Sequence, residues 1–223
     1  MFRPVLIASL LVFLSACAAT PANLGDLKTQ LSSYHAGGAY DRDLAVVDDE
    51  AANWMRANAG RVTRPALVLD IDETSLSNWP QMAANDFGYI PGGGCDGLPA
   101  GPCGATAWEL SARAAVIAPT LSLFNTAKTA GVAVFFITGR PENERDATAR
   151  NLRAAGYDGW AGLTLKPATL HVATATDYKA AERARIEAQG FTIIANVGDQ
   201  PSDLAGGHAL RTFLLPNPFY RIP

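Results

Sequence analysis

Two aspartates that directly follow an apolar segment are the residues of this chain best placed to do chemistry. The segment 66–69 reads Ala-Leu-Val-Leu, and a run without polar side chains is typical of a short strand buried on both faces. Asp70 and Asp72 come next, and residues two apart in an extended chain project to the same side. Ligands and ions bind at the carboxyl ends of strands in an open α/β sheet, so the sequence predicts a polar site here.

Later apolar segments are followed by polar side chains that complete such a site. A strand predicted over 132–137 ends in Thr-Gly, and one predicted over 192–197 ends in Gly-Asp-x-x-x-Asp. A lysine opens the helical stretch between them. The residues concerned are Thr138, Gly139, Lys179, Asp199 and Asp203.

In this order the motifs resemble the motif series of the haloacid dehalogenase (HAD) superfamily. The series is D-x-D-x-T, an apolar strand ending in Thr-Gly, a lysine, and Gly-Asp-x-x-x-Asp. Three stretches are most similar to the acid phosphatase branch: LDIDET at 69–74, FFITGR at 135–140 and NVGDQPSDL at 196–204. That branch includes bacterial envelope acid phosphatases and plant vegetative storage proteins. The resemblance extends from about residue 40 to the C-terminus.

The resemblance implies a metal-dependent phosphomonoesterase. Carboxylate oxygens at strand ends suit a hard cation, and we assign Mg²⁺ to the carboxylates of Asp70 and Asp199. By resemblance, the backbone carbonyl of Asp72 is a third protein ligand, and Asp203 supports the ligands through water or hydrogen bonds.

The same resemblance implies a role in catalysis for each remaining residue. Asp70 is the nucleophile that forms an aspartyl phosphate, and Asp72 is the general acid and then the general base. Thr138, the backbone N–H of Gly139 and Lys179 hold the phosphoryl oxygens. The expected substrates are small phosphomonoesters, with nucleoside monophosphates as a narrower hypothesis.

Each residue of these motifs also has a non-catalytic interpretation. An aspartate after a strand often caps a helix, Thr-Gly is often a turn, and a single lysine is usually solvated. Together and in order, they favour a phosphoryl-transfer site. The histidines are scattered and predict surface or core positions: His35, His171 and His208. The alternative function is a non-catalytic binding or storage lipoprotein that keeps the phosphatase fold, but the predicted nucleophile Asp70 is intact.

Composition indicates one globular domain. The chain has 223 residues, of which 48% are hydrophobic, which is enough for one sizeable core. The net charge of −3 predicts no nucleic-acid binding, because that would need a basic face. Alternating strands and helices predict a Rossmann-like, three-layer α/β/α fold with a parallel sheet. We place the phosphatase domain at 39–223, with a small cap inserted after the first catalytic strand, at about 75–117.

The first residues are typical of a bacterial lipoprotein signal peptide. Arg3 precedes an apolar run over 5–13, and Leu-Ser-Ala-Cys at 14–17 resembles a lipobox. We therefore predict a signal peptide at 1–17, acylation of Cys17 and a tether at 18–38 with a weak helical patch at 24–31. This implies a membrane anchor in the cell envelope, in the outer membrane or facing the periplasm. An ordinary signal peptide with an incidental cysteine is the alternative.

The predicted cap is rich in glycine and proline and carries two cysteines. In an oxidising envelope Cys95 and Cys103 are expected to form a disulfide, whereas a metal-binding pair would lack a nearby histidine or third cysteine. Four aromatic residues in or beside the cap suit its core, and stacking on a substrate base is a weaker hypothesis. They are Trp79, Phe87, Tyr89 and Trp108.

Two helices that flank the cap are predicted from spacing. Apolar residues three and four apart predict a helix from Tyr40 to just before Gly60, with Asp41 as its cap and the acidic group 48–50 as its solvated face. The stretch 111–129 also has helical spacing, interrupted at Pro119, where a second helix is expected to start.

Overall fold

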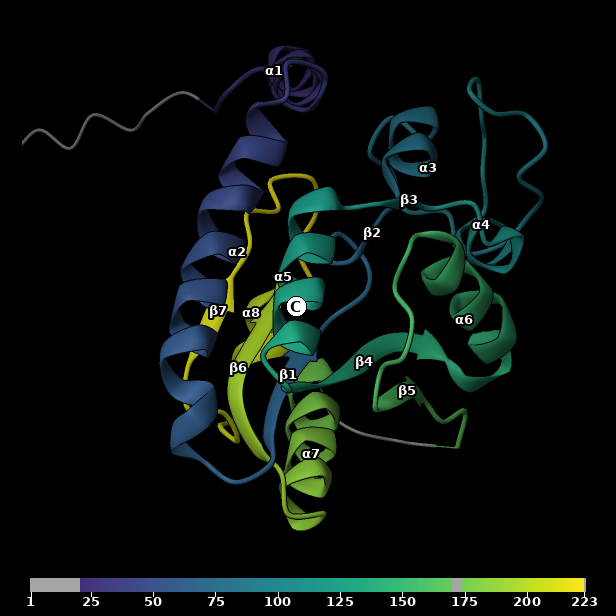
Figure 1. Cartoon of the computed structure of the whole chain (residues 1–223). Helices are drawn as coiled ribbons and strands as arrows, with labels where there is room; N and C mark the ends of the chain where they lie inside the picture. Colours follow the sequence, from purple (N-terminus) through teal and green to yellow (C-terminus); the bar gives the residue numbers. More distant parts are fainter. Residues whose placement is uncertain (1–20, 170–173, 223) are drawn as a thin grey trace, which may run out of the picture.

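The computed structural model describes residues 21–169 and 174–222 as one α/β domain (Figure 1). Its central sheet has five strands in the order β5-β4-β1-β6-β7, and every neighbouring pair is parallel. The strands are β1 (Pro65–Leu69), β4 (Ala133–Pro141), β5 (Gly162–Lys166), β6 (Thr192–Gly198) and β7 (Thr212–Leu214). The predicted fold class is therefore confirmed.

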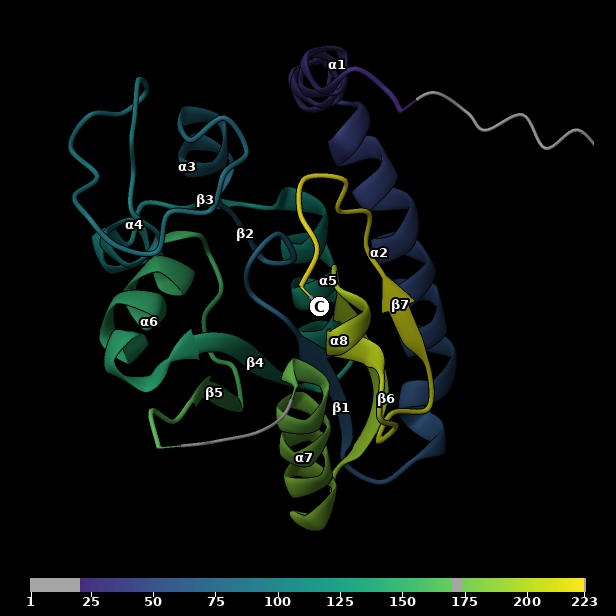
Figure 2. The ribbon, with the colours of Figure 1, turned by 180° about the vertical axis from the view of Figure 1, so that it is seen from behind.

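Helices cover both faces of this sheet, as the two opposite views show (Figures 1 and 2). Those outside the cap are α1 (Leu24–Ala36), α2 (Ala39–Asn58), η1 (Ala59–Arg61), α5 (Ala118–Thr129), η2 (Glu142–Glu144), α6 (Arg145–Ala154), α7 (Ala175–Ala188) and α8 (Pro201–Leu204). The view in Figure 2 places α7 and α8 in front of the sheet, and that in Figure 1 places α2 and α5 in front.

Strand β1 is apolar along its whole length because both of its faces are buried. Ala66 and Val68 belong to a smaller hydrophobic cluster with Tyr178 of α7. Leu67 and Leu69 belong to the larger cluster, which also contains residues of α2 and α5. Successive side chains of a strand point to opposite faces, so this burial requires the unbroken apolar run read from the sequence.

The insertion after β1 begins and ends beside the sheet. Its short strands β2 (Leu76–Ser77) and β3 (Ala115–Val116) pair antiparallel, and between them lie α3 (Trp79–Ala84), a Gly/Pro-rich loop and α4 (Ala105–Ser111). The hydroxyl of Tyr157, just after α6, donates to the carbonyl of Ser75 at 3.1 Å. Cys95 and Cys103 form a disulfide in the loop. The insertion is thus held at its base by the domain and stapled within its loop.

The helix predicted at the start of 111–129 is wrong. Helix α4 ends at Ser111, and Ala112 has a left-handed backbone with φ of 54°. The chain then forms β3, because this segment pairs with β2 at the base of the insertion. Helix α5 begins at Ala118 with Pro119 in its first turn, as the position of the proline predicts.

The segment before the domain contains more structure than a tether. Residues 24–36 form α1, capped by the side chain of Asn23, and Leu31 and Tyr34 pack against the main core. Helix α2 starts at Ala39 after Gly38, so Asp41 lies in its first turn and is not its cap. Among residues 21–169 and 174–222, no helix is long and apolar enough to span a bilayer. Cys17 and the predicted signal peptide lie outside the described residues, and both stay predictions.

Asp48 on α2 is buried, which corrects the prediction of a solvated acidic face. Its side chain accepts a hydrogen bond from the hydroxyl of Thr120 on α5 at 2.9 Å, and its residue exposure is 3%. The neighbouring Asp49 and Glu50 are exposed as predicted. Burial raises the pKa of Asp48 to about 7, so the carboxyl is held protonated in mildly acidic solution.

Asp48→Asn tests this protonation. Between about pH 4 and about pH 7 the folded protein keeps a proton that the unfolded chain has released, so wild-type stability falls as the pH rises. An amide does not titrate, so the stability of the variant relative to the wild type should rise by roughly 1–4 kcal/mol across this range. Urea unfolding at both ends of the range measures this change. Asp41→Asn, an exposed change on the same helix, is the control. A difference between Asp48→Asn and the wild type that stays constant across this range would contradict the protonated state.

Candidate active site

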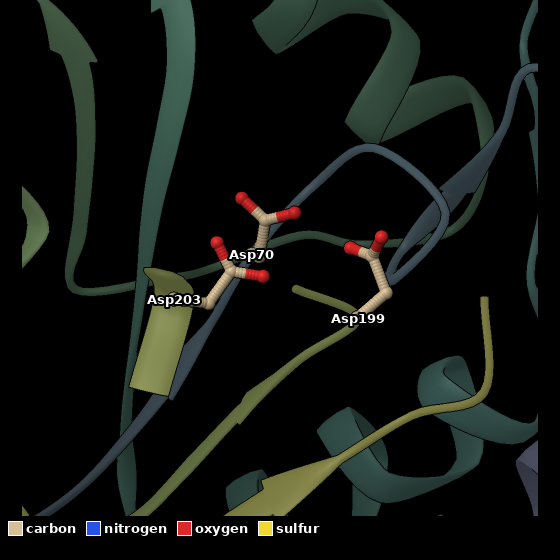
Figure 3. Close-up of side chains that lie close together, drawn as sticks. All are labelled: Asp70, Asp199 and Asp203. Carbon is tan, nitrogen blue, oxygen red and sulfur yellow. The ribbon is translucent and has the colours of Figure 1, made fainter. Parts of the chain in front are cut away.

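Three buried aspartates meet at the carboxyl ends of β1 and β6. Asp70 follows β1 and Asp199 follows β6, and the register of these two strands pairs Leu69 with Val197. Asp203 lies on α8, directly after the same turn. One carboxylate oxygen from each aspartate lies within 4.8 Å of the other two (Figure 3). Adjacent parallel strands therefore bring Asp70 and Asp199 together, although they are 129 residues apart in the sequence.

Lys179 is the cation of this group. Its Nζ lies 2.5 Å from Asp70 Oδ1 and 2.5 Å from Asp203 Oδ1, and all three side chains are buried. It projects from the second turn of α7, which begins after the N-cap Thr174 and packs on the sheet beside α8. One lysine therefore bridges the aspartate that follows β1 and an aspartate of α8.

Neutral donors hold the third carboxylate. The hydroxyl of Thr74 donates to Asp199 Oδ1 at 3.1 Å. The amides of Gln200 and Asn217 donate to Asp199 Oδ2 at 2.6 and 2.7 Å. Asn217 comes from the C-terminal segment, so the last residues of the chain help to orient this carboxylate.

The charges at this point are unbalanced in favour of acid. Burial raises the pKa of Asp70 well above its usual value, and although Lys179 opposes this, Asp203 and Asp199 raise it further. Burial and then Asp203 raise the pKa of Asp199 to about 6. Three converging carboxylates, two of which share Lys179, are the oxygen donors that a hard divalent cation prefers, and such an ion would favour their ionised forms. These residues thus fit the predicted Mg²⁺.

Asp72 faces a different cation from the other three aspartates. Arg140 Nη2 lies 2.6 Å from Asp72 Oδ1, and Arg140 Nε lies 3.1 Å from both carboxylate oxygens. The side-chain amide of Asn78 donates to Oδ1 at 2.8 Å. Burial alone would raise the pKa of Asp72, but Arg140 and Asn78 outweigh it and hold the pKa below its usual value. Its side chain is 25% exposed, against 8% for Asp70, so Asp72 is the more accessible carboxylate.

Thr138 and Gly139 lie within β4, next to the strand that carries Asp70. Phe136 of β4 pairs with Leu69 of β1, so Thr138 lies alongside the start of the loop that follows β1. The Thr138 hydroxyl is buried and accepts the backbone N–H of Arg140 at 3.1 Å. Gly139 is exposed, and a Cβ at this position would meet no atom within 4 Å. Open space therefore borders this part of β4.

The site joins the predicted residues into two groups. The carboxylates of Asp70, Asp199 and Asp203 lie together, so Asp203 belongs to the same cluster of oxygens as the two predicted ligands. The Asp72 side chain belongs to the Arg140 group instead. The predicted ligation by its backbone carbonyl stays a prediction.

Sequence reasoning gave no role to several polar residues that line this site. Arg140 directly follows the Thr-Gly motif, and that adjacency is the signal that could have identified it. Asn78 and Asn217 have no such signal, because neither lies in a recognised motif. Glu73 is buried beside them and accepts the Tyr220 hydroxyl at 2.7 Å, and burial raises the pKa of this glutamate to about 8.

Aromatic residues of the cap pack mainly on one another and on the domain. Trp79 stacks on His35 with ring centroids 3.8 Å apart, and both rings lie near Phe219. Phe87 contacts the same group, Trp108 is buried in the cap, and Tyr89 is exposed. His208 pairs with Glu187 at the surface, and His171 lies outside the described residues.

Comparisons with known proteins show the family of this chain. The family model described as HAD superfamily, subfamily IIIB (acid phosphatase), matches residues 11–223. Acid phosphatase 1 of Solanum lycopersicum is 33% identical over 194 residues, which cover 86% of this chain and 73% of that protein. Vegetative storage protein 1 of Arabidopsis thaliana is 31% identical over 186 residues, covering 82% and 66%.

A solved structure supports the same fold. The class C acid phosphatase from Bacillus anthracis, with tungstate bound, superposes with a TM-score of 0.66 at 20% identity. The superposition covers 87% of this chain and 86% of the Bacillus anthracis chain. The resemblance predicted from the motifs is confirmed.

Proposed function

Because the chain belongs to subfamily IIIB of the HAD superfamily, a subfamily of acid phosphatases, we propose that it hydrolyses small phosphomonoesters through an aspartyl phosphate on Asp70, with Mg²⁺ as its cofactor. The observation that carries this proposal is the buried cluster of Asp70, Asp199 and Asp203 with Lys179 between two of them. Such a cluster is costly to bury, and phosphoryl transfer with a divalent ion is the chemistry that uses all of its members.

Asp70 and Asp199 would hold Mg²⁺, with Asp203 beside them. When bound, the ion supplies the positive charge that lets an anionic carboxylate approach an anionic ester. Lys179 already holds Asp70 through Oδ1, and Asp70 Oδ2 accepts no hydrogen bond from any residue in the described ranges. Oδ2 is therefore the oxygen we assign to attack on phosphorus.

The reaction then needs one proton donor, which we assign to Asp72. As Asp70 Oδ2 bonds to phosphorus, the bond from phosphorus to the ester oxygen breaks, and that oxygen leaves with the electron pair and takes a proton from Asp72. In the second step water attacks the phosphorus of the aspartyl phosphate, gives a proton to Asp72, and releases inorganic phosphate and the Asp70 carboxylate. Lys179, Thr138 and the N–H of Gly139 are proposed to hold the phosphoryl oxygens during both steps.

Asp70→Asn tests the nucleophile. The amide is a poor nucleophile of nearly the same size, so hydrolysis of p-nitrophenyl phosphate should fall at least about a thousandfold while the protein stays folded. Removal of divalent ions with EDTA should abolish wild-type activity, and added Mg²⁺ should restore it. Asp49→Asn makes the same chemical change on the exposed face of α2 and should keep full activity. Full turnover by Asp70→Asn, or activity indifferent to EDTA, would refute the respective assignment.

Nucleoside monophosphates are the narrower substrate proposal. Its support is the exposed ring of Tyr89 in the cap, which could stack on a base, since one face of Trp79 is already stacked on His35. If a base is bound, kcat/KM for adenosine monophosphate should exceed that for ribose 5-phosphate by about tenfold, because stacking contributes roughly 1–3 kcal/mol. Equal values for the two esters would rule out recognition of the base, and the general phosphomonoesterase would remain.

A storage or binding protein is the second candidate, because plant storage proteins are among the relatives. The intact Asp70, Asp72, Lys179 and Asp199 favour the enzyme. The experiment with Asp70→Asn separates the two, since a storage protein would show no activity to lose.

We also propose that Cys17 is acylated and anchors the protein in the cell envelope. The support is the Leu-Ser-Ala-Cys sequence after the apolar run of the N-terminus. When the chain is expressed in a bacterium, Cys17→Ala should move the protein from the membrane fraction to the soluble fraction. Asp41→Asn, an exposed change on α2, should leave it in the membrane fraction. Membrane association of Cys17→Ala equal to that of the wild type would exclude a lipid anchor at this residue.

A further inference from the structure

The cap touches Asp72 through Asn78, the residue just before α3. The side-chain amide of Asn78 donates from Nδ2 to Asp72 Oδ1 at 2.8 Å. The carbonyl end of the same amide accepts the indole N–H of Trp108, on α4, at 2.7 Å. Asn78 and Trp108 are both buried, with exposures of 8% and 4%. A continuous hydrogen-bonded path therefore runs from the second cap helix to the predicted general acid.

This path allows only one orientation of the Asn78 amide. An indole N–H can only donate, so the amide oxygen must face Trp108, and the NH₂ group must then face the carboxylates. Glu73 strengthens the constraint, because it accepts the backbone N–H of Asn78 at 2.6 Å and its Nδ2 at 3.2 Å. Trp108 thus determines which end of Asn78 meets Asp72.

The two oxygens of Asp72 are left unequal. Oδ1 receives Arg140 Nη2 at 2.6 Å, Arg140 Nε at 3.1 Å and Asn78 Nδ2 at 2.8 Å. Within the described residues, Oδ2 receives only Arg140 Nε, at 3.1 Å. With three N–H donors around it Oδ1 has little capacity left for a proton, so Oδ2 is the oxygen able to carry one.

We propose that Asn78, oriented by Trp108, is a positioning residue that presents Oδ2 of Asp72 to the reacting oxygens. This inference rests on the proposed function, in which Asp72 protonates the leaving oxygen and later takes a proton from water. Loss of the Asn78 contact frees the carboxylate to turn about Arg140, and Oδ2 no longer meets the ester oxygen. On this proposal the cap acts in the chemical step through Asn78.

Esters with different leaving groups can show whether the Asp72 carboxylate is misplaced. An alkyl phosphate expels a strongly basic alkoxide that needs the proton of Asp72, whereas p-nitrophenolate is a weak base that leaves with little help. Damage limited to the position of Asp72 should therefore slow an alkyl ester more than a p-nitrophenyl ester. A general loosening of the fold should slow both equally. The ratio of the two values of kcat/KM separates these cases, because kcat/KM covers the step in which the ester bond breaks.

Trp108→Phe and Asn78→Ala test the inference, with glycerol phosphate and p-nitrophenyl phosphate as substrates and Mg²⁺ present. Trp108→Phe removes the indole donor and keeps an aromatic ring, and Asn78→Ala removes the contact directly. In each variant kcat/KM for glycerol phosphate should fall about tenfold more than for p-nitrophenyl phosphate, as expected for losing a hydrogen bond to a charged group. Trp54→Phe is the matched control. Trp54 lies on α2, and its indole N–H donates to the Ile194 carbonyl at 2.8 Å, so the variant also removes an indole hydrogen bond. Its ratio should equal that of the wild type.

Asp72→Asn distinguishes a failed inference from a failed function. If this variant loses activity selectively against glycerol phosphate while Trp108→Phe and Asn78→Ala slow both esters equally, the inference is overturned and the proposed function stands. If Asp72→Asn itself slows both esters equally, Asp72 is not the acid, and the inference falls with that assignment. Selective loss in all three variants, with an unchanged ratio in Trp54→Phe, supports the inference.

Discussion

Four aspartates lie close together at the carboxyl ends of β1 and β6, and their mutual repulsion is the constraint on which the rest of the site depends. Burying these carboxylates raises the free-energy cost of keeping them ionised, because burial and like charges both disfavour ionisation. The protein supplies one buried lysine for Asp70 and Asp203 and one buried arginine for Asp72. Within residues 21–169 and 174–222, Asp199 receives only neutral donors, which leaves a surplus of negative charge where a divalent cation fits.

The two aspartates of the D-x-D motif differ because their surroundings differ. Asp70 is almost fully buried among other acids, and its pKa is raised in spite of Lys179. Asp72, two residues later, is more exposed and is held by Arg140, and its pKa is lowered. A divalent cation would favour the ionised form of Asp70, which the proposed nucleophile needs, while Arg140 holds the side chain of Asp72.

Segments outside the sheet complete the site from two sides. The cap contributes Asn78 and Trp108 to the surroundings of Asp72. The C-terminal segment contributes Asn217 to Asp199 and Tyr220 to Glu73. The strand ends thus place the acids, while the cap and the last residues of the chain set the direction in which those acids point.

The amino-acid sequence alone determined the parallel sheet, because unbroken apolar strands alternating with helices have few other ways to be buried. It also identified the aspartates, since motifs at strand ends are local features that can be recognised without a structure. It failed where long-range contacts decide the outcome: residues 111–117 have helical spacing but pair partly as β3, and Asp48 carries a charged side chain but is buried against α5. Only the tertiary structure assigned Arg140 and Asn78 to Asp72, because the direction of a side chain depends on partners that no spacing along the chain encodes.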